Sequence, residues 1–115
     1  MSQKVLLIST PFVQLNTPYP AITYLKGYLN TLGIESQQTD LGLEVILELF
    51  SVKGLKMMFQ DAEECPVEFS ENAQRILSLK DTYLATVEAV IAFLQNTNPT
   101  LAQRICTRNY LPEAR

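Results

Sequence analysis

The chain has 115 residues, of which 47% are hydrophobic and 18% are charged, and its formal net charge is -3. This length and composition predict a single globular domain, residues 1–115, and exclude disordered, collagen-like and linker sequences. The negative net charge has the wrong sign for a nucleic-acid-binding domain, and no apolar run approaches the roughly 20 residues of a membrane span. We therefore expect a cytoplasmic protein that binds neither nucleic acid nor a membrane.

The residue types present also restrict the chemistry. Histidine is absent. Its absence removes the usual zinc ligand, the usual general base and the Ser-His and Cys-His nucleophile pairs, so most self-contained hydrolase mechanisms are excluded. The two cysteines, Cys65 and Cys106, stand far apart with no second pair, which predicts reduced thiols and no thiolate metal site. We assign no catalytic residue and no metal ligand to this chain.

Residues 1–40 predict a β-α-β unit. Aliphatic residues run without interruption over 5–8, a pattern typical of a strand covered on both faces in a parallel sheet. A loop with three prolines follows. Apolar residues at helical spacing then predict a helix over 20–32 that ends at Gly33, and a polar second strand over 34–39 completes the unit.

Residues 41–108 predict a mainly helical segment. Helical periodicity resumes after the second strand, and Gly54 weakens it, so two helical pieces with a break at 51–54 are expected. The acidic stretch over 61–69 predicts a solvated connection, and Ser70 then suits the N-cap of a further helix.

The longest apolar stripe of the chain extends over residues 73–94 and predicts a long helix. After it, Asn98 and Pro99 are typical of the cap and first residue of a short last helix.

Two strands are too few for a stable parallel sheet, since a two-stranded ribbon is not independently stable. The missing layer can come from later strands of a longer protein, or from two copies that pair strand edges or helices. We favour the first explanation, with a homodimer as its consequence.

A candidate site follows from the predicted sheet. Ligands of open parallel sheets bind beyond the carboxyl ends of the strands. The residues expected at this rim are Ser9, Thr10, Pro11, Phe12, Tyr19 and Asp40. No glycine-rich turn follows the first strand and no Walker-type lysine is present, so nucleotide binding is not predicted.

A family resemblance covers roughly residues 4–50. The shared pattern is an aliphatic strand, a proline-containing loop, a helix with Tyr-Leu pairs, a glycine turn and a terminal aspartate. It consists of Val5-Leu6-Leu7-Ile8-Ser9-Thr10-Pro11-Phe12, Pro20, Tyr24-Leu25, Tyr28-Leu29, Gly33 and Asp40. In this pattern the chain resembles the start of the cobalamin (B12)-binding domain that precedes the catalytic domain of many radical S-adenosylmethionine (radical SAM) enzymes.

The resemblance implies an α/β fold: a partial Rossmann-like (flavodoxin-like) B12-binding domain with a short parallel sheet and several helices. It also implies that the rim residues contact cobalamin or a substrate. The complete enzymes perform radical chemistry, such as methyl transfer or cyclisation, in a C-terminal domain that binds S-adenosylmethionine and a [4Fe-4S] cluster. We expect that absent domain to be the partner of this chain, which as a truncated piece would be inactive by itself.

Two departures from the family pattern affect the cofactors. The Asp-x-His-x-x-Gly motif, with which many cobalamin proteins ligate cobalt, cannot exist without histidine, so cobalamin would bind here with no histidine ligand from this chain. The Cys-x-x-x-Cys-x-x-Cys motif of the iron-sulfur cluster is also absent, and neither Cys65 nor Cys106 matches it. The cluster is therefore expected only in the downstream domain.

Each assignment has a plainer alternative. Asp40 suits the cap of the helix after the second strand, which requires no ligand. The aromatic rings of Phe12, Tyr19 and Tyr24 could close the core over the strand end instead of stacking on a macrocycle. For the whole chain, the alternative is a small structural or self-association domain with no cofactor, whose stripe over 73–94 packs against another copy.

Overall fold

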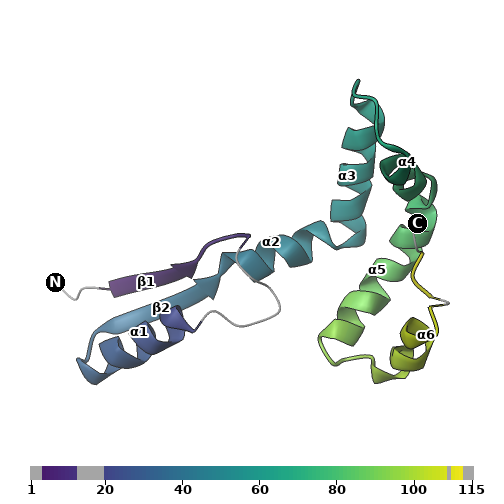
Figure 1. Cartoon of the computed structure of the whole chain (residues 1–115). Helices are drawn as coiled ribbons and strands as arrows, with labels where there is room; N and C mark the ends of the chain where they lie inside the picture. The colour runs from purple at the N-terminus through teal and green to yellow at the C-terminus, as the bar shows by residue number, and fades with distance from the viewer. Residues whose placement is uncertain (1–3, 13–19, 109, 113–115) are drawn as a thin grey trace. The chain divides into compact units, whose positions relative to one another are not determined.

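The structure is a computed structural model that describes residues 4–12, 20–108 and 110–112. Within these residues it is an α/β protein with two parallel strands, six α-helices and one 3-10 helix (Figure 1). The chain forms two compact units, Met1–Ile46 and Leu47–Arg115. The expected α/β class is confirmed at this level, and the grouping of all residues into one domain stays a prediction.

The first unit contains the predicted β-α-β segment. Strand β1 (Lys4–Ser9) pairs in parallel with β2 (Glu35–Asp40), with Lys4 opposite Glu35 and Ser9 opposite Asp40. Helix α1 (Ala21–Thr31) connects the two strands and packs against both. All three elements lie within one or two residues of the predicted ranges.

The expectation that the first strand is covered on both faces is wrong for the described residues. Val5 and Leu7 are half-buried and alternate with Leu6 and Ile8, which are 58% and 45% exposed. Successive side chains of a strand point to opposite faces, and in the described part of the chain α1 is the helix that packs on this sheet. One aliphatic face of β1 is therefore open.

Glycine ends α1 as predicted. Gly33 adopts a φ of 69°, and the N–H groups of Gly33 and Ile34 donate to the carbonyls of Asn30 and Leu29 at 3.1 and 3.0 Å. This pair of bonds is the Schellman arrangement, which favours a residue without a Cβ at the left-handed position.

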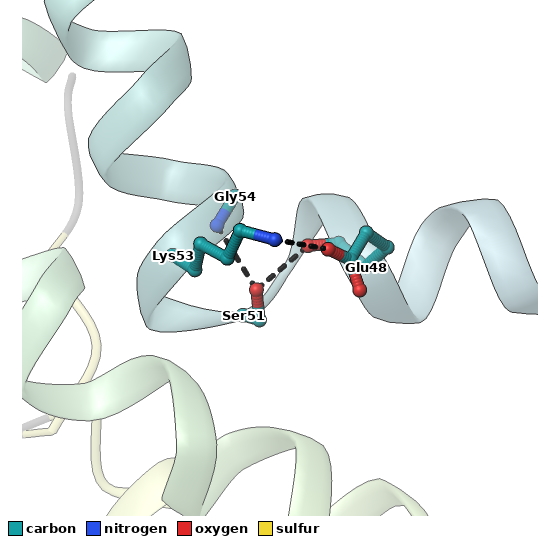
Figure 2. A network of polar contacts seen from close by, with 4 residues as sticks. All are labelled: Glu48, Ser51, Lys53 and Gly54. Carbon is teal, nitrogen blue, oxygen red and sulfur yellow. Dashed lines mark hydrogen bonds and ion pairs between the residues drawn. The ribbon is translucent and has the colours of Figure 1, made fainter.

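The predicted break between two helical pieces is confirmed at the junction of α2 (Leu41–Leu49) and α3 (Val52–Glu64). Ser51 lies at this junction and its hydroxyl accepts from the Gly54 N–H at 3.0 Å while donating to the Glu48 carbonyl at 2.7 Å (Figure 2). The Lys53 ammonium pairs with the Glu48 carboxylate at 3.4 Å. Ser51 thus caps α3 and also ties it to the last turn of α2.

The stripe over residues 73–94 forms two helices, so the prediction of one long helix is wrong. Helices α4 (Glu71–Ser78) and α5 (Lys80–Leu94) are separated at Leu79, where φ is -99° and ψ is 9°. The Ser78 hydroxyl donates to the Arg75 carbonyl at 2.7 Å, and the same carbonyl accepts from the Leu79 N–H at 3.2 Å. The interruption cannot be predicted from the apolar periodicity, because the apolar spacing continues through Leu79.

The ends of α4 and of the last helices test the remaining cap predictions. Ser70 accepts from the Ala73 N–H at 3.4 Å, which confirms it as the N-cap of α4. Pro99 is the first residue of the 3-10 helix η1 (Pro99–Leu101), as predicted, and α6 (Ala102–Cys106) follows it. Asn98 occupies the N-cap position of η1, as predicted, but its side chain makes no cap hydrogen bond there; its Oδ1 accepts from the Thr100 hydroxyl at 2.8 Å.

The second unit packs its helices around α5. Helix α5 contacts α3, α4 and η1, and its buried residue Val87 lies in the core with Leu55 and Leu101. The ring centroids of Phe59 and Tyr83 are 6.3 Å apart, so aromatic contact joins α3 to α5. This core is small, since these three are the buried hydrophobic side chains among the described residues.

Candidate functional site

The carboxyl ends of β1 and β2 form the rim that the sequence predicts as a site. Ser9 lies directly opposite Asp40 in the ladder, so the structure brings these two residues together. Thr10, Pro11 and Phe12 follow β1 at the same edge, with Thr10 exposed and Pro11 half-buried. Tyr19, the remaining candidate, lies outside the described residues.

Asp40 caps the helix that follows it. The Leu43 N–H donates to Asp40 Oδ1 at 3.0 Å, and Leu43 is the third residue of α2. A carboxylate at this position satisfies an otherwise unpaired amide and complements the helix dipole. The structure therefore shows the capping role that was the plainer alternative, and this bond occupies only one of the two carboxylate oxygens.

Ser9 is enclosed. Its side chain shares the sheet face of Val5 and Leu7, and the residue is only 4% exposed. Its hydroxyl has no hydrogen-bond partner in the described part of the chain. A ligand at the rim would meet Thr10 and Phe12 more readily than Ser9.

The aromatic residues near the rim face solvent. Phe12 is 81% exposed and adopts a φ of 64°, a left-handed conformation that a bulky residue seldom takes. Tyr24, at the start of α1, is 77% exposed. The alternative in which these two rings close the core is therefore wrong, because neither ring is covered.

A pocket that the sequence did not predict lies between α3 and α4. It is an apolar groove of about 260 Å³, and its lining residues are Leu55, Met58, Phe59, Ala62, Phe69, Ala73, Ile76 and Leu77. Their i, i+3, i+4 and i+7 spacing was the available signal, but it marks an apolar face without showing whether a neighbour fills it.

An ion pair joins charged side chains of α3 and α5. The Lys80 ammonium donates a hydrogen bond to the Glu63 carboxylate. This bond, together with the attraction of the negative charge, raises the pKa of Lys80 above its ordinary value of 10.5. The ion pair thus links α3 to the first residue of α5, although α4 lies between them in the sequence.

The other chemistry-bearing groups are dispersed. Among residues 4–12, 20–108 and 110–112, no three His, Cys, Asp or Glu side chains gather closely enough to hold a metal ion. Cys65 and Cys106 are free and exposed. No helix in the described part of the chain has the length and apolar content needed to cross a membrane.

Comparisons with known proteins give no family assignment. No protein-family model matches the chain, and neither the curated proteins nor the solved structures contain a match.

Proposed function

We propose that this chain is the N-terminal part of a cobalamin-binding-like domain of a radical SAM enzyme, located in the cytoplasm and not catalytic by itself. In this proposal it contributes one rim of a cobalamin or substrate site within a partial Rossmann-like sheet. The observation that carries the proposal is the parallel β1-α1-β2 segment, which ends both strands at one edge with Ser9 opposite Asp40. Phe12, three residues after Ser9, is exposed.

The rim has groups suited to a flat ligand that bears amides. An exposed aromatic ring such as Phe12 can stack on a planar macrocycle. Asp40 keeps one carboxylate oxygen beyond its bond to the Leu43 N–H, and that oxygen can accept from a ligand amide. Cobalamin would bind without a histidine ligand from this chain, since the chain has no histidine.

The open face and small size of the sheet also support the proposal. Leu6 and Ile8 are exposed on β1, and further helices of a longer polypeptide would cover such a face. The S-adenosylmethionine and [4Fe-4S] sites belong, in this proposal, to a downstream C-terminal catalytic domain. A reading frame with a Cys-x-x-x-Cys-x-x-Cys run beyond Arg115 would support it.

A hydroxocobalamin titration tests the proposal. The product of the complete reading frame is titrated and followed by visible absorbance, with a saturable spectral change as the expected result. Phe12→Ala should weaken binding about two- to twelvefold, the range that corresponds to the 0.5–1.5 kcal/mol typical of an aromatic contact. Tyr28→Ala, on an α1 residue that is 62% exposed and outside the rim, serves as the control. No spectral change at high micromolar cobalamin would overturn the proposal.

The α3–α4 groove favours a second candidate, a self-association domain with no cofactor. Its wholly apolar lining and the 42% exposure of Ile76 suit an apolar partner on another copy. Under this candidate Ile76→Glu weakens self-association in sedimentation equilibrium, whereas Leu94→Glu, at a 67% exposed position outside the groove, does not. Equal behaviour of the two variants would exclude the groove as the contact.

A further inference from the structure

The two strands of the sheet differ in composition. Strand β1 reads Lys-Val-Leu-Leu-Ile-Ser and is aliphatic on both faces, whereas β2 reads Glu-Ser-Gln-Gln-Thr-Asp and is polar. Aliphatic residues on both faces are typical of interior strands, and polar or charged residues protect edge strands from pairing. The sequence thus marks β2 as a sheet edge and β1 as a strand with neighbours on both sides.

The structure leaves one of those neighbours missing. In the described residues β1 pairs only with β2, so the backbone N–H and C=O groups along its other edge have no ladder partner. Another extended strand can pair with these backbone groups, because its own N–H and C=O groups repeat with the same spacing. Leu6 and Ile8 stand exposed beside this edge.

We propose that, in this chain, the free edge of β1 pairs with β1 of a second copy. The two strands run antiparallel about a two-fold axis perpendicular to the sheet, and the four strands take the order β2-β1-β1-β2. In this arrangement each β1 strand has a hydrogen-bonded neighbour on both sides, and the two polar β2 strands lie at the outer edges of the sheet. The pairing does not depend on cobalamin.

The symmetry restricts the register. A two-fold axis perpendicular to the sheet keeps every side chain on its own face, so only residues that point the same way can lie opposite each other. Centring the pairing on Leu7 places Leu7 opposite the partner's Leu7, and Leu6 opposite the partner's Ile8. Centring it on Leu6 would instead place Lys4 opposite the partner's Ile8. Both registers place aliphatic residues opposite each other in the three central pairs. One pair further out, the Leu7 register places Val5 opposite the partner's Ser9, whereas the Leu6 register places the charged Lys4 opposite an aliphatic side chain. We therefore assign the Leu7 register.

Paired charge variants test the contact. Leu6→Lys with Ile8→Lys places like charges opposite each other twice, whereas Leu6→Lys with Ile8→Glu places opposite charges there. Both positions are exposed in the single chain, so circular dichroism should show the same fold for both variants. Sedimentation equilibrium should give a dissociation constant at least tenfold higher for the Lys/Lys variant than for the Lys/Glu variant.

The overall charge works against this result, which makes the comparison strict. The Lys/Lys variant has a net charge of -1, two positive charges added to -3, and the Lys/Glu variant keeps -3. General repulsion would therefore favour dimers of the Lys/Lys variant. Equal dissociation constants, the reverse order, or an original chain that stays monomeric at high micromolar concentration would overturn the pairing.

Disulfide trapping tests the register even if one charge variant fails to fold. Both natural cysteines are first replaced by serine, and Leu6→Cys and Ile8→Cys are introduced in separate chains. In the Leu7 register these cysteines face each other only between the two kinds of chain, so a mixture should cross-link under mild oxidation and neither variant alone should. Cross-linking of the Leu6→Cys chain alone, or none in the mixture, would overturn the assigned register.

Discussion

Gly54 allows the last turn of α2 and the first turn of α3 to approach closely. A Cβ atom on this residue would lie 2.2 Å from the Glu48 carbonyl oxygen and 2.5 Å from that of Leu49. Both are backbone atoms, so they can yield only if the junction opens. In the sequence Gly54 reads as a weak point in a helical pattern, and the approach that requires it becomes visible only in three dimensions.

We expect Gly54→Ala to destabilise the second unit by about 1–3 kcal/mol, the usual cost of inserting atoms into a tightly packed site. Gly27→Ala in α1 is the control, because its added Cβ would meet no atom within 4 Å beyond its chain neighbours and the adjacent helix backbone, and alanine favours a helix. Urea unfolding followed by circular dichroism measures both. A Gly54→Ala chain as stable as the original would show that the junction can relax.

The ion pair of Lys80 with Glu63 should give a pH-dependent contribution to stability. Because the pKa of Lys80 is higher in the folded chain than its ordinary value of 10.5, the contribution is complete below that pH. It is lost as the pH rises through the raised pKa. An NMR titration of the Lys80 ammonium should show the upward shift, and Glu63→Gln should remove most of it, because Glu63 is its largest cause and Asp81 a smaller one. Glu64→Gln is the control, and an unchanged Lys80 titration in Glu63→Gln would contradict this origin.

At the scale of elements, two serine caps should differ in strength. Ser51 accepts from the Gly54 N–H at 3.0 Å, whereas Ser70 accepts from the Ala73 N–H at the longer distance of 3.4 Å. We expect Ser51→Ala to cost about 1 kcal/mol and Ser70→Ala less, since long hydrogen bonds are weaker. Urea midpoints compare the two, and Ser51→Thr should retain most of the cap. A larger loss for Ser70→Ala would contradict the geometric ranking.

Helix ends marked by a glycine or a capping residue were predicted well, whereas the boundary between α4 and α5, which carries no such residue, was missed. Helix α1 was bounded correctly because Gly33 and the polar residues after it are read directly from the sequence. The interruption at Leu79 was missed because it carries neither glycine nor proline, and the apolar spacing continues into α5. Hydrophobic periodicity indicates which face of a helix is apolar, but it does not fix where the helix axis changes.

At the scale of the whole molecule, the two compact units should respond separately to mutation. Leu101 is 5% exposed in the second unit, so Leu101→Ala should destabilise that unit by about 2–5 kcal/mol. Leu94→Ala, at a 67% exposed position, should change stability by less than about 0.5 kcal/mol. Hydrogen exchange measures both units at once, and the β1–β2 amides should keep their protection. Equal loss of protection in both units would show that they unfold together.

The sequence by itself determined the β-α-β order, the break before α3, the capping Ser70 and the placement of Ser9 and Asp40 at strand ends, because each depends on neighbours along the chain. Tertiary structure alone decided that one face of β1 is open, that Phe12 faces solvent, and that a groove lies between α3 and α4. These features depend on which surfaces meet. A pattern of apolar residues shows that a face needs cover, whereas only packing between distant segments shows whether the cover is present.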